Sequence, residues 1–259
     1  MKVVLFCGGF GTRLKEYSEQ IPKPLVEVGN RPIMWNLMKY YAHFDHTNFI
    51  LCLGYRGDLI KKFFLDYDEC LSTDFELSPG TRKIKLLGPD IGDWKVLFRD
   101  TGLHNNIGQR LLAVKPELEN EDYFLANYSD ALSDLPLQDM LDRFKKSNAI
   151  GAFVAVKPSN SLSKIELDSD GTVTAIDYLS NTVHINGGFF VFRPEIFEYI
   201  KPGEELVESP FQRLIAEKKL MAYQYDGFWC AMDTFKDKKK FDEMFERGDR
   251  PWEIWKAAH

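Results

Sequence analysis

The sequence lacks features that would place this protein in a membrane or outside the cell. The 259 residues contain no run of 18 apolar residues, so no transmembrane helix is expected. A secretory signal has a charged segment, a long apolar core and a cleavage site, and the N-terminus lacks these features. It leads directly into the mostly apolar run KVVLFC. We therefore expect a cytoplasmic protein with no membrane partner.

Cysteine and histidine are also scarce. The four cysteines contain no C-x-x-C pair, so we expect free thiols in a reducing compartment and no zinc or disulfide framework; they are Cys7, Cys52, Cys70 and Cys230. The five histidines form no spaced cluster that would indicate a nucleophilic triad; they lie at positions 43, 46, 104, 184 and 259.

Positive charge is not concentrated anywhere that would suit a nucleic acid. The net charge is −6, and the densest cationic run, KDKKK at 236–240, fits the solvated face of a helix better than a binding patch. We expect no nucleic-acid partner. A single nucleotide stays possible, since it can be bound by a few local charges.

The hydrophobic pattern predicts alternating strands and helices over the first 150 residues. Expected strands are 2–7, 48–53, 94–100, 123–128 and 149–156, and expected helices are 31–44, 58–67, 108–118 with a break at Pro116, and 136–147. Such alternation is typical of a parallel α/β sheet.

The pattern changes in the middle of the chain. Residues 164–179 predict two strands joined by a turn at Asp170-Gly171, and 184–194 and 220–225 predict further strands. We therefore expect one domain spanning 1–259: an α/β fold with a Rossmann-like, mostly parallel sheet and a small β-rich insertion over its C-terminal edge.

A glycine-rich turn follows the first strand, in the stretch GGFGTRLKEYSEQIPKP. Gly8, Gly9 and Gly11 free the backbone to turn its N–H groups inward, which is how backbone nests bind phosphate. Arg13 and Lys23 add positive charge, and the prolines on either side of Lys23 should hold its segment extended. The stretch indicates a polyphosphate site.

The turn alone is weak evidence, because GGFG matches neither the dinucleotide fingerprint nor the P-loop. With Arg13 and Lys23 the stretch resembles the G-G-x-G-T-R-L…K-P signature of the sugar-phosphate nucleotidyltransferases. The likeness runs from Met1 to the late PWEIW and is greatest to members that use CTP. It implies the same fold, a homo-oligomer, and phosphate contacts from Thr12 and Ser129 in addition to the turn.

Two aspartates are expected to bind Mg²⁺. Asp130 follows the apolar run YFLANY, at the sheet edge where α/β proteins bind ligands, and Mg²⁺ often uses only one or two carboxylates plus substrate phosphates. A lone Asp there is more often a turn or helix cap, and we assign that role to Asp134. The resemblance implies that Asp130 and Asp233, in the segment FWCAMDT, are the metal ligands.

The segment DTGLHNNIGQRL also matches the family, and the resemblance implies that Arg110 contacts the triphosphate. A helix-surface arginine is the alternative. Residues 105–107 depart from the family, which has small polar residues there.

The acceptor side departs most from the family. The resemblance implies acceptor contacts from Asn186, Gly187 and Gly188, but the family's E-K-P segment, whose Lys holds the sugar phosphate, is replaced around Tyr178 and Leu179. Lys164 is our candidate for the missing cation, with a solvated strand residue as the alternative. Without that Lys, and with a bulkier wall, we expect glucose 1-phosphate to be a poor acceptor.

The resemblance implies a Mg²⁺-dependent transfer of CMP from CTP to a phosphorylated metabolite, such as a sugar 1-phosphate, with release of pyrophosphate. Arg13 and Lys23 are the expected catalytic cations. The alternatives are use of dTTP or UTP, a non-catalytic nucleotide-sugar-binding regulatory homologue, and a nicotinamide dehydrogenase, against which the missing G-x-G-x-x-G argues.

Overall fold

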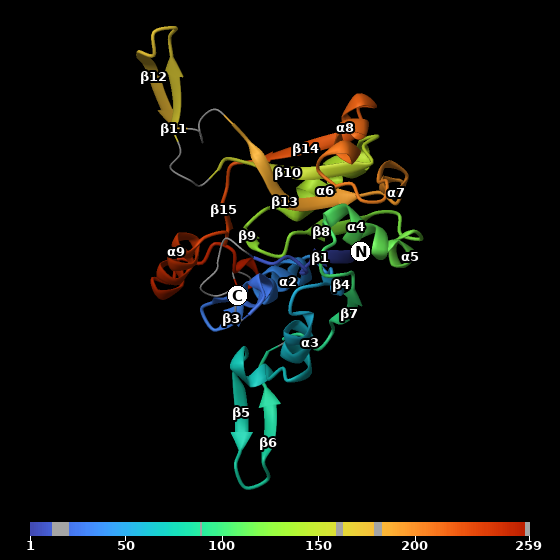
Figure 1. Ribbon diagram of the computed structural model, residues 1–259. Coiled ribbons are helices and arrows are strands. Elements are labelled where there is room, and N and C mark those ends of the chain that lie inside the picture. Colours follow the sequence, from blue (N-terminus) through green and yellow to red (C-terminus); the bar gives the residue numbers. More distant parts are fainter. Residues whose placement is uncertain (12–20, 89, 159–162, 179–182, 257–259) are drawn as a thin grey trace.

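A single seven-stranded sheet forms the centre of the molecule (Figure 1). The computed structural model describes residues 1–11, 21–88, 90–158, 163–178 and 183–256. The strand order is β14-β10-β13-β8-β1-β4-β7. The strands are β1 (Lys2–Phe6), β4 (Asn48–Leu53), β7 (Lys95–Asp100), β8 (Phe124–Asn127), β10 (Gly151–Val156), β13 (Ile185–Phe192) and β14 (Leu220–Tyr225).

The sheet is parallel except for β13, which runs antiparallel to both of its neighbours, β8 and β10. In β1, Val3 and Leu5 belong to the core on one face, and Val4 and Phe6 to the core on the other. Side chains alternate between the two faces of a strand, so a continuous apolar run indicates a strand that is covered on both.

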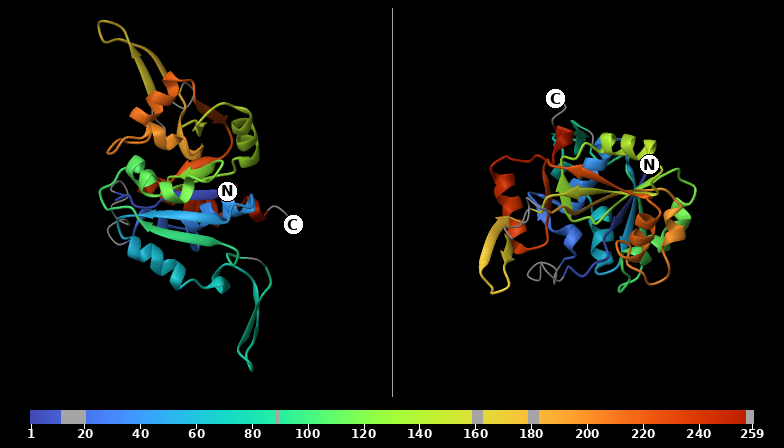
Figure 2. Two further views of the ribbon diagram at one scale, coloured as in Figure 1. Left: turned by 90° about the vertical axis from the view of Figure 1, so that its right-hand side faces the viewer. Right: turned by 90° about the horizontal axis from the view of Figure 1, so that it is seen from above.

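Helices cover both faces (Figure 2). The first face packs against α2 (Ile33–His43), α3 (Gly57–Leu65), α6 (Leu137–Lys146) and α9 (Phe235–Glu246). The second packs against α4 (Ile107–Ala113), α5 (Lys115–Leu118), α7 (Ile196–Tyr199) and α8 (Ser209–Ala216). The predicted break at Pro116 is the start of α5, where proline occupies the first turn.

Shorter elements complete the chain. Two small antiparallel pairs are β2 (Glu27–Val28) with β3 (Arg31–Pro32), and β9 (Ala131–Ser133) with β15 (Trp229–Ala231). The 3₁₀ turns are η2 (Lys23–Leu25), η3 (Glu69–Leu71) and η5 (Ile254–Lys256).

Two β-hairpins project from opposite ends of the molecule (Figure 1). They are β5 (Phe75–Ser78) with β6 (Lys83–Leu86), and β11 (Ser163–Leu167) with β12 (Val173–Tyr178). The second is the predicted insertion, but it points away from the sheet and does not lie over its edge. The first was not predicted.

The mostly parallel α/β fold is confirmed, and the strands at 48–53 and 220–225 match the prediction to the residue. The four cysteines are free thiols, as expected. Within the described ranges, no helix has the length and apolar character needed to cross a membrane.

Candidate active site

A cleft of about 230 Å³ opens at the carboxyl ends of β1 and β8. The loop after β1, the segment around Lys23, the start of α4 and residues 128–130 line it. Larger hollows occur elsewhere on the surface, but this cleft brings together two of the predicted glycines, Gly9 and Gly11, with Lys23 and Asp130. Ligands of open α/β sheets bind at this position.

The small β9–β15 pair places the two predicted metal ligands side by side. Asp130 immediately precedes β9, and a single residue separates Asp233 from the end of β15. The strands pair with Ala131 opposite Ala231, and the Met232 N–H donates to the Asp130 carbonyl at 2.9 Å. This register brings the two carboxylates to the same point although they are far apart in the sequence.

Asp233 is held at the start of α9. The next residue, Thr234, is the N-cap of this helix and forms a capping box with Asp237. The Asp237 carboxylate also accepts a hydrogen bond from the Asp233 N–H at 3.2 Å. Capping interactions of this kind satisfy N–H groups that a helix leaves free, and here they also orient a functional residue.

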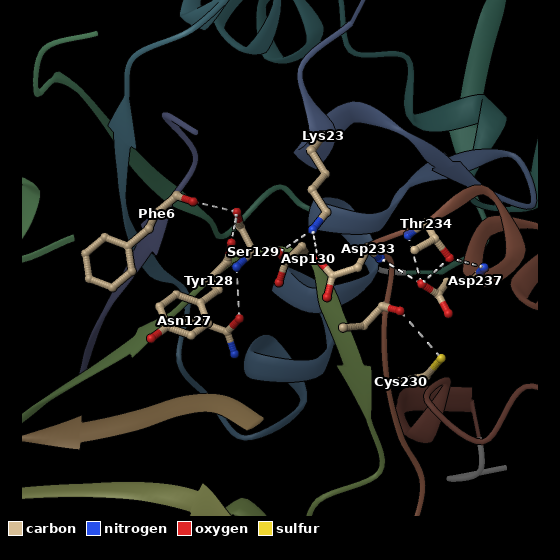
Figure 3. Close-up of polar contacts among 11 residues, drawn as sticks. Phe6, Lys23, Asn127, Tyr128, Ser129, Asp130, Cys230, Asp233, Thr234 and Asp237 are labelled. Carbon is tan, nitrogen blue, oxygen red and sulfur yellow. Dashed lines mark hydrogen bonds and ion pairs between the residues drawn. The ribbon is translucent and has the colours of Figure 1, made fainter. Parts of the chain in front are cut away.

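Lys23 lies between the two carboxylates (Figure 3). Its Nζ donates to Asp130 Oδ2 and to Asp233 Oδ1, each at 2.7 Å. The prediction that the prolines hold this segment extended is wrong in part. Pro22 is extended, but Lys23 begins a 3₁₀ turn in which Pro24 is buried. The turn aims the lysine at the carboxylates.

The ion pair changes the titration of its members. Burial raises the pKa of Asp130, and the Lys23 ammonium only partly opposes this effect. Burial alone would lower the pKa of Lys23, but the two carboxylates outweigh it and the pKa is raised. Lys23 is therefore a full cation at neutral pH, positioned in the cleft.

The glycine turn has two different steric requirements. Gly11 has φ +62°, which favours glycine. A Cβ at Gly8 would lie 2.1 Å from a guanidinium nitrogen of Arg110, so Gly8 makes room for that side chain. At Gly9, no atom of the described residues lies within 4 Å of an added Cβ. Thr12 and Arg13 lie outside the described residues, and their phosphate contacts stay predictions.

Arg110 is buried and ties three loops together. Its guanidinium donates to the carbonyls of Gly8 at 2.9 Å, Leu53 at 3.1 Å and Gly102 at 2.9 Å. Leu53 is the last residue of β4, and Gly8 and Gly102 lie in the loops after β1 and β7. It also donates to the Thr101 hydroxyl at 2.7 Å. The helix-surface alternative is wrong. The contact with the triphosphate stays a prediction, and the structure adds a role in positioning the loops.

Ser129 is buried between the same loops. Its hydroxyl lies 2.8 Å from the Phe6 carbonyl, its N–H donates to Asn127 Oδ1 at 3.0 Å, and its backbone has φ +67°. A left-handed backbone at a non-glycine residue costs energy and persists where surrounding contacts hold it. Ser129 thus turns the chain from β8 toward Asp130. Its contact with nucleotide stays a prediction.

Asn186, Gly187 and Gly188 lie on β13 and contact Tyr128 and Trp229. The Asn186 amide reaches the Tyr128 hydroxyl at 3.3 Å, and the Gly187 carbonyl accepts from Trp229 Nε1 at 2.8 Å. Gly188 has φ +76°, and a Cβ there would lie 2.6 Å from the Tyr128 ring. The glycine pair therefore lets two aromatic rings approach the strand.

Lys164 and Tyr178 are not among the residues that line this cleft, contrary to our expectation. Both lie on the projecting β11–β12 hairpin. The Lys164 ammonium pairs with Glu166 at 2.5 Å, and Tyr178 is exposed. These positions favour the solvated-strand alternative for Lys164. The expectation failed because nothing in the sequence showed where the hairpin would point. Leu179 lies outside the described residues.

Other residues of the cleft were missed or misassigned from the sequence. Tyr128 and Glu205 line it, and only their proximity in the fold shows this. Asn106 caps α4 with a capping box, a local signal that was available in N-x-x-Q. Asp134 does not cap α6. It accepts hydrogen bonds from the Tyr225 hydroxyl and the Phe228 N–H.

The two carboxylates suit a divalent cation that takes its remaining ligands from a substrate. Lys23 shows that a positive group fits between them. The part of the chain that the structure describes contains no group of three or more His, Cys, Asp and Glu side chains placed to hold a metal. Mg²⁺ accepts such a sparse protein site when phosphate oxygens complete it.

Comparisons with known proteins show the family of this chain. The chain matches the family model described as nucleotidyl transferase over residues 2–238. It is 34% identical to a probable glucose-1-phosphate cytidylyltransferase of Bacillus subtilis and 32% identical to glucose-1-phosphate cytidylyltransferase of Salmonella typhi, each over 98% of this chain and 100% of the relative. A solved structure of UDP-glucose pyrophosphorylase complexed with UDP-glucose shares the fold, with TM-score 0.68, 13% identity and coverage of 95% of this chain and 98% of that one. The chain therefore belongs to the nucleotidyl transferase family.

Proposed function

We propose that this protein is a Mg²⁺-dependent cytidylyltransferase that joins CMP from CTP to a sugar 1-phosphate and releases pyrophosphate. The observation that carries the proposal is the Asp130–Lys23–Asp233 cluster at the mouth of the glycine turn, in a chain of this family. The free thiols suit the reducing cytoplasm, where we place the reaction.

The chemistry needs no general base. An oxygen of the acceptor's phosphate attacks the α-phosphorus of CTP, the new P–O bond forms, and the bond from the α-phosphorus to the bridging oxygen of pyrophosphate breaks. The attacking phosphate is already an anion, so the enzyme's task is positioning and charge neutralisation. Burial raises the pKa of the nearby Cys7 thiol to about 12, which argues against a thiolate nucleophile.

Each residue of the cluster has a distinct role in this proposal. Asp130 and Asp233 would hold Mg²⁺, which when bound neutralises the phosphate charge at the reacting centre. Lys23 would exchange its carboxylate partners for a phosphate oxygen, and Arg13 would add a second, fork-shaped cation. Arg110 and Ser129 keep the loops in place.

The preference for CTP is supported by the names of the two cytidylyltransferase relatives, and UTP and dTTP are the alternatives. Two arguments about the identity of the acceptor oppose each other. Those names favour glucose 1-phosphate, whereas the missing E-K-P lysine argued against it. The position of Tyr178 on the hairpin removes one reason for a crowded acceptor wall.

A matrix of nucleoside triphosphates against phosphorylated metabolites, read by pyrophosphate release, tests the proposal. CTP, UTP and dTTP should each be paired with glucose 1-phosphate, other sugar 1-phosphates and non-sugar phosphates, with and without Mg²⁺. We expect release only with Mg²⁺, and fastest with CTP and a sugar 1-phosphate. Equal use of dTTP would reject the base preference, and no release in any pairing would favour a non-catalytic homologue.

Two conservative variants test the cluster. Asp130→Asn and Asp233→Asn should each reduce turnover by 10²-fold or more, on the order expected for loss of a group that stabilises the transition state. Exposed Asp122→Asn is the matched control and should keep wild-type turnover. Circular dichroism should show the same fold for all three. If either cluster variant keeps most of its turnover at saturating Mg²⁺, the metal assignment is wrong.

A further inference from the structure

Asp134 fastens the turn between β14 and β15 to the end of β9. Its carboxylate oxygen Oδ1 accepts hydrogen bonds from the Tyr225 hydroxyl and, at 2.8 Å, from the Phe228 N–H. Tyr225 is the last residue of β14, at the edge of the main sheet, and Phe228 immediately precedes β15. One carboxylate thus connects three strands.

Both backbone polar groups of Phe228 bind the same short segment. Its carbonyl accepts from the Ser133 hydroxyl at 2.7 Å and from the Asp134 N–H at 3.3 Å, while its N–H donates to the Asp134 carboxylate. Phe228 therefore lies opposite Asp134, one step beyond the pair formed by Ser133 and Trp229. These contacts fix which residue of β15 faces which residue of β9.

Gly227 leaves the space through which the Tyr225 side chain reaches Asp134. A Cβ at Gly227 would lie 2.1 Å from the Tyr225 hydroxyl oxygen. The backbone of Tyr225 is held by its pairing with Val156 in the sheet, so an added methyl group would displace the hydroxyl. The contact with Asp134 therefore depends on the glycine.

The β9–β15 pair is short, so its register depends on the contacts at its ends. Asp130 and Asp233 lie beyond one end of the pair, and Asp134 lies at the other. A slip by one residue moves a strand by about 3.4 Å and turns its side chains to the other face. Mg²⁺ requires oxygen ligands at about 2.1 Å in near-octahedral geometry, so the two carboxylates could not share an ion after such a slip.

We propose that Asp134 is a positioning residue for the two metal carboxylates and acts through the register of β9 with β15. The proposal rests on the metal assignment of Asp130 and Asp233 in the proposed function. Asp134 is not among the described residues that line the cleft, so its effect on the ion is indirect.

The expected effect follows from the population of the correct register. Without the Asp134 contacts the short pair would sample other registers, and the two carboxylates would be aligned in only a fraction of the molecules. The apparent affinity for an ion falls in proportion to that fraction, and enough of the ion restores the aligned state. Loss of Asp134 should therefore weaken the response to Mg²⁺ more than it lowers the maximal rate.

Two substitutions of Asp134 test this expectation. Asp134→Ala removes both side-chain contacts and should raise the Mg²⁺ concentration for half-maximal pyrophosphate release by about tenfold, with kcat at saturating Mg²⁺ within about twofold of the wild type. Asp134→Asn keeps an oxygen that can accept both hydrogen bonds and should restore most of the response.

Asp139→Ala is the matched control. Asp139 also accepts a hydrogen bond from a tyrosine of β14, Tyr223, at 2.6 Å, but it lies on α6 and does not join β9 to β15. This variant should keep the wild-type Mg²⁺ dependence, which separates the register from a general loss of packing against β14.

Amide hydrogen exchange tests the register without the reaction. The Met232 N–H, which donates to the Asp130 carbonyl, should exchange about tenfold faster in Asp134→Ala, whereas the amides of β1 and β4 should keep their protection. If Asp134→Ala does not fold, Tyr225→Phe and Gly227→Ala leave the carboxylate in place and should show the same changes to a smaller extent.

An unchanged Mg²⁺ dependence or an unchanged Met232 exchange rate in Asp134→Ala would overturn the proposal, even if the variant melts at a lower temperature. If the wild type releases no pyrophosphate, the proposed function fails, but two measurements still decide this proposal. They are exchange at Met232 and the affinity for Mn²⁺, a substitute for Mg²⁺, measured by electron paramagnetic resonance. Asp134→Ala should bind Mn²⁺ about tenfold more weakly than the wild type, and equal affinities would reject the positioning role.

Discussion

Lys23 is the residue that joins the two predicted metal ligands in this structure. Its ammonium donates to both carboxylates at 2.7 Å and reduces the repulsion between them. A metal ion would have to replace this cation, and the triphosphate supplies the anion to which the lysine can move. This arrangement favours binding of the metal together with the nucleotide over binding of the metal alone.

Lys23→Gln should therefore tighten binding of Mn²⁺, as a substitute for Mg²⁺, in the absence of nucleotide by about tenfold, or roughly 1.4 kcal/mol. Free Mn²⁺ measured by electron paramagnetic resonance gives the affinity. Lys39→Gln is the control, because Lys39 is also partly buried and pairs with a carboxylate, Asp90, outside the cleft. An unchanged Mn²⁺ affinity in Lys23→Gln would show that the ammonium does not compete with the metal.

His46 should contribute to the pH dependence of stability. It lies between α2 and β4 and, among the described residues, neither ring nitrogen makes a hydrogen bond of normal geometry. Burial, with a smaller contribution from the N-terminal ammonium, lowers its pKa to about 4. The unfolded chain, with the ordinary histidine value of about 6.5, binds the proton first, so stability should fall as the pH drops from about 6.5 toward 4.

His46→Gln should reduce this loss of stability by about 1–2 kcal/mol between pH 7.5 and pH 5. Urea denaturation of the wild type and the variant at the two pH values measures it. His43→Gln, at an exposed position of the same helix end, is the control and should keep the wild-type pH dependence. Identical slopes for the wild type and His46→Gln would mean that the ring is solvated in the native state.

At the scale of elements, β13 connects the sheet to the cleft. Its antiparallel direction places Asn186, Gly187 and Gly188 at the end of the sheet where β8 finishes and Tyr128 begins the turn to Asp130. The glycines let Tyr128 and Trp229 lie against the strand. Because Gly188 has no side chain, the strand leaves room for the Tyr128 ring, which lines the cleft.

Gly188→Ala should displace Tyr128 toward the cleft and raise KM for at least one substrate several-fold. Gly203→Ala is the matched control, because Gly203 has φ +86° but no atom within 4 Å of the added Cβ. Both variants should lose roughly 1 kcal/mol of stability from the left-handed backbone, and only Gly188→Ala should change KM. Initial rates and thermal melts measure the two effects, and equal KM values would rule out displacement of the ring.

At the scale of the whole molecule, one sheet is shared by two cores. Strands such as β1 contribute alternate residues to each core, so neither core can lose its packing without disrupting the other. Trp252 is buried in the first core against Phe241, with ring centroids 5.5 Å apart. The protein should behave as a single folding unit, in line with the predicted single domain over 1–259.

We expect one unfolding transition, with tryptophan fluorescence and far-ultraviolet circular dichroism giving the same midpoint. Trp252 reports on the first core, while circular dichroism reports on the helices of both. The melts should be repeated at several protein concentrations to separate dissociation from unfolding. Midpoints that differ at every concentration would indicate two independent units and contradict the single domain.

The local sequence was sufficient to predict most strands of the sheet, and it suggested a phosphate site that stays a prediction. Apolar runs and helical spacing depend on neighbouring residues, so β4 and β14 could be placed to the residue. The glycine turn and Lys23 suggested a phosphate site because their residue types match phosphate binding. The metal assignment of Asp130 and Asp233 needed the family resemblance, since a lone Asp after a strand has no distinctive local signal.

The relations between distant segments could not be obtained in this way. The meeting of Asp130 and Asp233 depends on the register of β9 with β15, and the role of Arg110 on three loops that converge around it. Lys164 had the expected strand but not the expected surroundings, because the direction of a hairpin depends on what it packs against. Local patterns report the conformation of a segment, whereas the contacts between segments depend on packing and hydrogen bonds that form only when the whole chain folds.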